Sequence, residues 1–194
     1  MLAVTWTCRK FSYSFFRGVK ELDVVIYFSR QGENLVNGEI VRIDTGHTAM
    51  VAKIIACELG AELVPIIPLN PYPDGYQAAV ELARKEAKYD ARPHVRDLGI
   101  QWDRYERIFL GFPNWCGSFP MVIATLLEKQ VLTGKRIYPF CTHEGGAFGK
   151  SLVELERLFP EAKWMPGLAV RGSRANKAGK AVTNWLAQRY EWEE

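Results

Sequence analysis

The chain lacks several features that would assign it to a well-defined class. Its 194 residues contain no apolar run near the roughly 20 residues that a membrane-spanning helix needs, so no membrane span is expected. The four cysteines form no C-x-x-C pair and the three histidines add no zinc-like cluster, so no metal site is predicted. Free thiols in a reducing cytoplasm are the simplest interpretation, which predicts a cytoplasmic protein.

A basic stripe is also missing. The formal net charge is +3, but residues 1–20 hold four basic residues and no acid, so the remainder carries −1. A near-neutral body gives no reason to expect nucleic-acid binding. Residues 1–20 mix aromatic and basic residues without periodicity, which favours an N-terminal extension, disordered in part, over a secretory signal or a short amphipathic anchor. Residues 21–194 are predicted to form a single domain.

From Glu21 onward, apolar strands alternate with amphipathic helices. Strands are expected over residues 23–29, 62–67, 107–112, 136–141 and 163–170, and helices over residues 48–59, 74–89, 120–129, 147–159 and 175–190. This alternation predicts an α/β fold with a parallel sheet covered on both faces. The Asn-Gly pair in "VNGEI" predicts a small hairpin before the first helix. Ligands of such sheets bind beyond the carboxyl ends of the strands, which directs attention to three loops.

The first loop runs from Ser29 to Thr48, between a buried strand and a helix that begins at "TGHT". The first N–H groups of a helix have no internal partners, and the helix dipole favours negative charge there. Ser29 and Thr48 offer hydroxyl groups, Gly46 allows close approach, and Arg30 adds positive charge. The loop therefore predicts a phosphate site. The alternative is that Thr48 only caps the helix.

The second loop is "FPNWCGSFP", residues 112–120. A tryptophan in a loop beside glycine is suited to stacking on a flat ring. The alternative is that Trp115 packs over the sheet edge.

The third loop is "CTHEGGAFG", residues 141–149. Gly145 and Gly146 expose backbone N–H donors that suit the carbonyl groups and nitrogens of a heterocycle. His143 and Glu144 are placed to touch the same ligand, although His143 is equally well interpreted as an exposed loop histidine. Together the three loops predict a site for a phosphorylated planar heterocycle.

The order of these motifs resembles the flavodoxins. The strand, phosphate loop and helix, then "PNWCGSFPM", then "CTHEGGAFGKS" are similar to the three FMN-contacting loops of that family. The separation of Ser29 from "TGHT", together with "NPYPDGY", "ARP" and "PGLAVRG", resembles a flavodoxin-like subgroup found in bacteria. The resemblance covers about residues 23–188. It implies a doubly wound three-layer sandwich, a five-stranded sheet in the order 2-1-3-4-5, and non-covalent FMN.

The resemblance also implies the site residues. The phosphate would be held by Ser29, Thr45, Gly46, His47 and Thr48; Trp115 would stack on the ring; Asn114, Cys116 and Gly117 would line its reactive edge; and Thr142, His143, Glu144, Gly145 and Gly146 would contact its other side. Arg30 and Pro113, which neighbour these residues in the sequence, are also expected to bind the cofactor. No catalytic side chain is expected, because the flavin performs the chemistry.

The implied function is electron transfer, or NAD(P)H-linked reduction of a small acceptor such as a quinone. The partners would be a redox protein, or NAD(P)H and a small molecule, and a homodimer is left open. Two departures from the family favour a small acceptor: the near-neutral body differs from the acidic electron carriers, and Cys116 replaces a position that is often aromatic, leaving the ring more open. A third departure is His47, where the subgroup often has Asn.

Two other classes of protein have a doubly wound sheet. A response-regulator receiver needs clustered acids after the first strand and a lysine after the fifth, where this chain has Ser29-Arg30 and Arg171-Gly172. A regulatory or binding domain of the same fold without flavin remains the alternative function. A hydrolase would need a nucleophile elbow such as G-x-S-x-G, which is missing, and Cys116 with His143 has no orienting acid in the sequence.

Overall fold

The computed structural model describes residues 22–192, so the expectation for residues 1–20 lies outside the described residues. The central sheet is parallel and has the order β4-β1-β5-β6, with both β7 and β8 paired to β6. Its strands are β1 (Leu22–Tyr27), β4 (Glu62–Pro65), β5 (Tyr105–Pro113), β6 (Arg136–His143), β7 (Lys163–Trp164) and β8 (Leu168–Arg171). Counting β7 and β8 as one interrupted strand, this is the predicted order 2-1-3-4-5.

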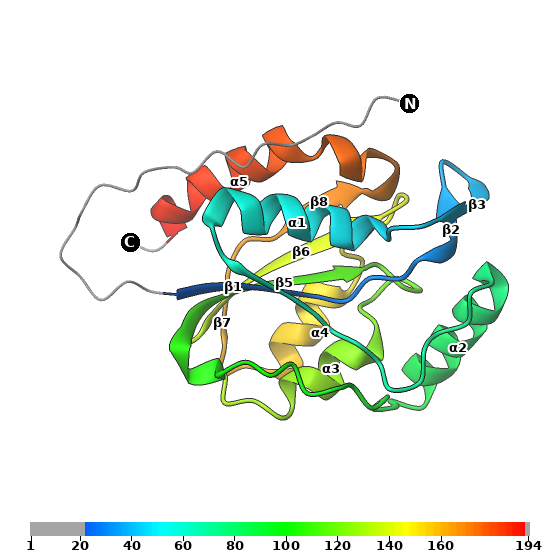
Figure 1. Cartoon of the computed structure of the whole chain (residues 1–194). Helices are drawn as coiled ribbons and strands as arrows, with labels where there is room; N and C mark the ends of the chain where they lie inside the picture. Colours follow the sequence, from blue (N-terminus) through cyan, green and yellow to red (C-terminus); the bar gives the residue numbers. More distant parts are fainter. Residues whose placement is uncertain (1–21, 193–194) are drawn as a thin grey trace.

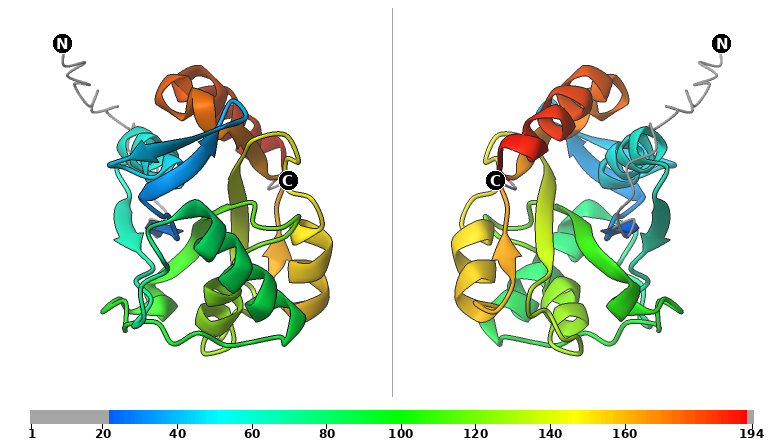
Figure 2. Two further views of the ribbon diagram at one scale, coloured as in Figure 1. Left: turned by 90° about the vertical axis from the view of Figure 1, so that its right-hand side faces the viewer. Right: turned by 90° about the vertical axis from the view of Figure 1, so that its left-hand side faces the viewer.

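Helices cover both faces of the sheet, which makes three layers (Figure 1, Figure 2). Helices α1 (His47–Leu59) and α5 (Gly179–Trp192) lie on one face, and α3 (Met121–Leu127) and α4 (Ser151–Leu158) lie on the other. Helix α2 (Tyr76–Lys88) stands at the end of the sheet where the carboxyl ends of β1 and β5 emerge. Two 3₁₀ turns, Trp102–Arg104 and Gly172–Lys177, precede β5 and α5.

The core is divided by the sheet into two clusters, because successive side chains of a strand point to opposite faces. Val24 and Ile26 of β1 belong to the cluster on the α3 and α4 side. Val25 belongs to the cluster on the α1 and α5 side, with Phe109 and Tyr138. The unbroken apolar strands in the sequence are thus explained by burial on both faces.

The predicted hairpin is present as β2 (Gly32–Val36) and β3 (Glu39–Ile43), a separate two-stranded sheet. Asn37 and Gly38 have φ angles of 52° and 88°, the left-handed values that a tight hairpin turn requires. The base of the hairpin is held to the loop before α2, since Glu33 N–H donates to the carbonyl of Asp74 over 2.9 Å and Arg42 forms an ion pair with Asp74.

Several element boundaries differ from those expected. The helix expected from residue 147 begins at Ser151, because Ala147 and Gly149 adopt left-handed φ angles of 46° and 55°. The fifth strand is split around Pro166, which has no N–H to donate to a neighbouring strand. The final helix begins at Gly179, after a 3₁₀ turn that occupies the start of the expected range.

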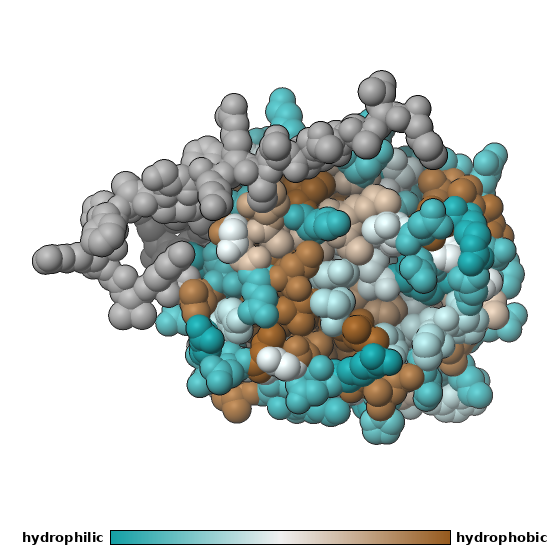
Figure 3. All heavy atoms as spheres, viewed as in Figure 1, coloured by the Kyte–Doolittle hydropathy of each residue, from teal (hydrophilic) through white to brown (hydrophobic). Residues whose placement is uncertain are grey.

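The cysteines among the described residues differ in their bonding state. Cys116 and Cys141 are free thiols, whereas Cys57 takes part in a disulfide bond, so the expectation of free thiols is wrong for Cys57. Figure 3 shows apolar residues gathered across the middle of one face around edge strand β4, and the exposed Ile67 and Leu69 follow that strand.

Within residues 22–192, every helix is too short or too polar to cross a membrane.

Candidate functional site

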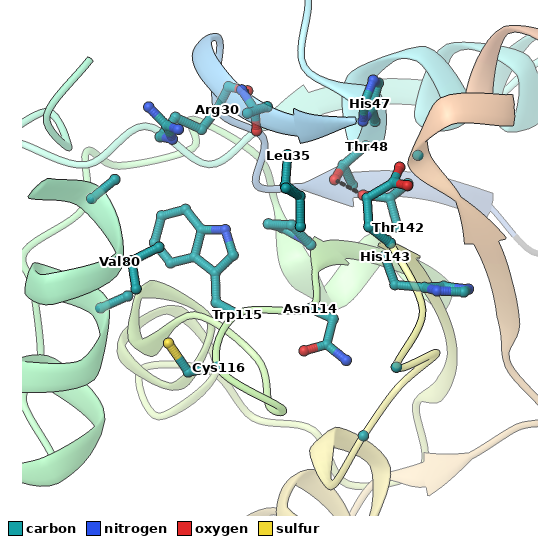
Figure 4. A pocket seen from close by; sticks show the side chains of 18 of the residues that line it. Arg30, Leu35, His47, Thr48, Val80, Asn114, Trp115, Cys116, Thr142 and His143 are labelled. Carbon is teal, nitrogen blue, oxygen red and sulfur yellow. Dashed lines mark hydrogen bonds between the residues drawn. The ribbon is translucent and has the colours of Figure 1, made fainter. Parts of the chain in front are cut away.

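A cavity of about 380 Å³ lies at the carboxyl end of the sheet, between the hairpin, α2 and the loops that follow β1, β5 and β6 (Figure 4). Fourteen of the sixteen predicted site residues line it: Ser29, Arg30, His47, Thr48, Pro113, Asn114, Trp115, Cys116, Gly117, Thr142, His143, Glu144, Gly145 and Gly146. The other two, Thr45 and Gly46, line a neighbouring cavity of about 670 Å³, which shares Ser29 and Arg30 with the first.

One end of the cavity is formed by the first turn of α1. Ser29 Oγ accepts a hydrogen bond from the Ala49 N–H over 3.1 Å, so a residue of β1's end caps a helix that begins far along the chain. Gly46 permits this approach, because a Cβ there would clash with Ser29 Oγ and the Arg30 carbonyl. Thr48 is not the cap: its hydroxyl is 2.7 Å from that of Thr142 on β6.

Arg30 lines the cavity, but its donors are already in use. Its guanidinium donates to the carbonyls of Pro73 and Asp74 over 2.9 and 3.0 Å, and to the Glu33 carbonyl. Burial lowers the pKa of Arg30, and the Asp74 and Glu33 carboxylates partly offset that effect. Arg30 therefore clamps the hairpin to the loop before α2, and can act on a ligand through its charge only.

Glu144 links three segments around the cavity. Its side chain is 11% exposed; Oε1 accepts the Ser173 N–H over 2.7 Å, and Oε2 accepts the Asn37 N–H at the hairpin tip over 3.2 Å. The imidazole of His47 is half-buried nearby, and burial lowers its pKa while the Glu144 carboxylate acts in the opposite direction. The lowered pKa favours the neutral form of the imidazole, which lies at the first turn of α1.

The loop after β5 is a tight turn. Trp115 and Ser118 exchange two backbone hydrogen bonds of 2.8 and 3.0 Å, and the residues between them, Cys116 and Gly117, have φ angles of 54° and 86°. Asn114 fixes this turn to the third loop, since its Oδ1 accepts the Gly117 N–H and its Nδ2 donates to the Ala147 carbonyl. The second and third loops are thus one connected unit.

Trp115 packs against two neighbouring rings and also lines the cavity. Its indole makes edge contacts with Phe28 and Tyr72, at centroid distances of 5.3 and 4.7 Å. The same ring lines the cavity and is half-buried (Figure 4). A tryptophan held by two neighbouring rings presents a fixed apolar surface to a ligand.

The third loop presents backbone donors. Gly145 and Gly146 are exposed, and His143 Nδ1 accepts the Gly145 N–H over 3.0 Å. That nitrogen is therefore engaged by the backbone, and, within the part of the chain described, no hydrogen bond joins His143 to Cys116. A Cys–His hydrolytic pair is not assembled. Over residues 22–192, no group of three or more His, Cys, Asp or Glu side chains is arranged to hold a metal ion.

Sequence reasoning missed eight residues that line the cavity: Asn34, Leu35, Tyr76, Ala79, Val80, Ala83, Gly149 and Gly172. Two are in the hairpin and four are on α2, elements whose position depends on tertiary contacts. The small residues Ala79 and Ala83, one helical turn apart, were the only sequence signal for a close approach by α2.

The chain is similar to known flavoproteins. A family model described as Flavodoxin matches residues 42–189. Among solved structures, a proposed flavoprotein from Bacteroides uniformis is 23% identical, with a TM-score of 0.69 over 86% of this chain and 98% of that one. A proposed flavoprotein from Bacteroides eggerthii is 25% identical, with a TM-score of 0.64 over 86% and 96%. A Lactobacillus acidophilus flavoprotein in complex with FMN is 18% identical, with a TM-score of 0.61 over 81% and 97%. Curated proteins yielded no match.

Proposed function

Because the chain belongs to the flavodoxin family, we propose that its cavity binds FMN and that the protein transfers electrons through it. The observation that carries this proposal is the pairing, in one cavity, of a helix N-terminus with a fixed tryptophan. The volume of about 380 Å³ lies in the range of cofactor pockets. The FMN complex of the similar Lactobacillus acidophilus flavoprotein supports the choice of flavin.

The α1 end suits the phosphate. In the first turn of α1 the Ala49 N–H donates to Ser29 Oγ, whereas the N–H groups of His47 and Thr48 have no intrahelical partners, and the buried Thr48 hydroxyl lies at the same place. Because Gly46 has no side chain, residues 29–30 can lie directly against it. The two segments of the predicted phosphate loop, which the hairpin separates in the sequence, are therefore adjacent. We infer that these groups, with His47 and Thr45, bind the phosphate.

The end of the cavity formed by the second and third loops suits the flavin ring. Trp115 would provide a stacking surface, and the exposed backbone of Gly145 and Gly146 would donate to polar atoms at the ring edge. Leu35 of the hairpin points into the same cavity and would exclude water (Figure 4). When bound, FMN supplies one- and two-electron chemistry, and the chain positions it and controls access.

We further propose that the electron acceptor is a small molecule such as a quinone, with NAD(P)H as the donor. Cys116 is exposed at the cavity mouth, where it covers less of a ring than an aromatic side chain would. The near-neutral body offers little electrostatic steering to a charged protein partner.

The first test is the visible absorption spectrum of the purified full-length protein, with any released cofactor identified by chromatography. A two-banded flavin spectrum that yields FMN is the expected result. Protein that is colourless and also fails to bind added FMN would contradict the proposal and favour the flavin-free regulatory domain.

The second test measures NAD(P)H oxidation by the FMN-loaded protein, with quinones compared with protein acceptors. The Cys116→Trp variant should slow quinone reduction because it covers the ring. Unchanged quinone turnover in that variant would count against the open-ring explanation.

A further inference from the structure

Behind Trp115 lies an aromatic cluster that the FMN site does not use directly. Trp115, Tyr72 and Phe28 contact one another, with centroid distances of 4.7 Å between Trp115 and Tyr72 and 5.4 Å between Phe28 and Tyr72. Only Trp115 of the three lines the first cavity, whereas Tyr72 and Phe28 line the neighbouring one. The cluster is therefore the wall between the two cavities.

The cluster ends in a buried acid. Glu86 of α2 is 9% exposed, and its Oε2 accepts a hydrogen bond of 2.7 Å from the Tyr72 hydroxyl. Burial is the largest cause raising the pKa of both groups. A buried carboxylate is a costly residue in a helix that packs through alanines, and this phenol is its hydrogen-bond partner.

Tyr72 contacts a possible electron acceptor, Trp115, and a proton acceptor, Glu86. A phenol loses an electron readily only if its proton can leave at the same time, and Glu86 Oε2 accepts the hydrogen bond of the Tyr72 hydroxyl over 2.7 Å. Phe28 has no such proton and is 2% exposed, so it packs the other two rings and takes no part in proton transfer. Trp115 faces the proposed flavin, and Tyr72 is one ring contact farther from it.

Resting on the FMN site proposed above, we propose that Tyr72 and Glu86 form a proton-coupled electron donor to Trp115. The oxidant is photo-excited flavin. With FMN bound, the Trp115 indole would give one electron to this oxidant, and Tyr72 would then give one electron to the oxidised indole. The phenolic proton moves to Glu86 Oε2. The protein is left with a neutral tyrosyl radical at Tyr72, a protonated Glu86 and an intact Trp115. Return of the electron to Tyr72 and of the proton from Glu86 restores the resting state.

The proposed activity moves an oxidising equivalent out of the cofactor cavity to a half-buried side chain that has its own proton acceptor. Trp115, which forms the cavity wall, is thereby protected from lasting oxidation. The two steps need only the contact between Trp115 and Tyr72 and the hydrogen bond between Tyr72 and Glu86.

The test is electron paramagnetic resonance of the FMN-loaded full chain, frozen during blue illumination. A cobalt(III) ammine complex takes the electron from the flavin, so that the protein radical persists. Protein labelled with β-deuterated tyrosine distinguishes tyrosyl from tryptophan radicals. The expected radical is tyrosyl in the wild-type protein, and it should be replaced by a tryptophan radical in Tyr72→Phe.

Glu86→Gln keeps a hydrogen-bond acceptor but removes the proton acceptor, so it should reduce the tyrosyl signal severalfold. The matched control is Tyr105→Phe, since Tyr105 also donates to a carboxylate, Glu62, but lies at the start of β5, at the opposite end of that strand from Trp115. It should leave the tyrosyl signal unchanged.

Two results would overturn the proposal. A tyrosyl radical that survives in Tyr72→Phe would place it elsewhere, and a tryptophan radical in wild-type protein would show that Tyr72 does not donate. Both require FMN to be bound, which the absorption spectrum establishes beforehand. Protein without FMN would instead contradict the proposed function, so the two failures are distinguishable.

Discussion

The hydroxyl oxygens of Thr48 and Thr142 lie 2.7 Å apart and join the first turn of α1 to the end of β6. Both residues are nearly completely buried, at 1% and 4% exposure. The bond therefore fixes the distance between the proposed phosphate end of the cavity and the loop that carries Gly145. Loss of this hydrogen bond should lower both the affinity for FMN and the free energy of unfolding.

Thr142→Val leaves the Thr48 hydroxyl buried without its partner. We expect unfolding in urea to show a loss of about 1–3 kcal/mol. FMN affinity, measured by fluorescence titration, should fall about tenfold, which corresponds to about 1.4 kcal/mol.

The control is Thr125→Val on α3, where a buried hydroxyl donates to the Met121 carbonyl of its own helix. FMN affinity should survive in that variant. If both variants weaken FMN binding equally, the Thr48–Thr142 bond has no specific role in the site.

Gly46 and Gly75 form a matched pair, because each precedes a helix with an extended backbone (φ −63° and −71°). A Cβ at residue 46 would clash with Ser29 and Arg30, whereas one at residue 75 would meet only Glu33 Oε2, at 3.7 Å. Gly46→Ala should lower the unfolding free energy by about 1–3 kcal/mol and weaken FMN binding. Gly75→Ala should be tolerated, and comparable losses in both would refute this steric argument.

The stability of the flavin-free protein should depend on pH through His47. Burial lowers the pKa of His47, and that of His143, below the usual value of 6.5. Between the folded and unfolded pKa values the unfolded chain binds more protons, so stability rises with pH there. Stability should be fully present above about pH 6.5 and decrease as the pH falls below it.

Urea unfolding at several pH values measures this dependence, and His47→Gln should make the curve flatter. The exposed His94 is the control, since His94→Gln should leave the curve as in the wild-type protein. An unchanged curve for His47→Gln would show that the ring is not a source of the pH dependence.

The ion pair between Asp23 and Arg107 lies near the start of β1, at the far end of the sheet from the cavity. Arg107 Nε donates to Asp23 Oδ1 over 2.6 Å, and the side chains are 13% and 11% exposed. Breaking a buried pair by changing one partner costs roughly 3–5 kcal/mol. Both side chains here are only partly buried, so Asp23→Asn should cost less than that, but still measurably in thermal or urea unfolding, with FMN affinity unchanged. A loss of affinity below the unfolding transition would contradict the separation of the two regions.

The regular part of the fold was predictable because its signals are local. The run Val24–Tyr27 is apolar throughout, as a strand buried on both faces requires, and Gly60 ends α1 with a left-handed φ of 63°. The Asn37–Gly38 pair specifies its turn by itself. These patterns also place the three loops at one edge of the sheet, which is why fourteen of the sixteen residues meet in one cavity.

What escaped prediction depends on contacts between distant segments. The donors of Arg30 are used by carbonyls more than 40 positions away, and nothing near Arg30 in the sequence indicates this. The left-handed Ala147 and Gly149 delay the start of α4, and the Lys150 N–H that follows them donates to the Gly117 carbonyl in another loop. Leu35 enters the cavity only because the hairpin folds over it.

The hairpin has a consequence for how the phosphate loop is assembled. An insertion between Ser29 and Thr45 lengthens the chain segment whose ends must meet, and each doubling of a loop adds about 0.6 kcal/mol of closure entropy. Because Gly32 pairs with Ile43, the inserted strands close that loop themselves, so Ser29 and Ala49 meet almost as if the insertion were short. Additional residues at Asn37–Gly38 would therefore disturb the contact with Glu144 long before they disturbed the phosphate end. The chain can vary in length at this one turn while the geometry of the anion site is preserved.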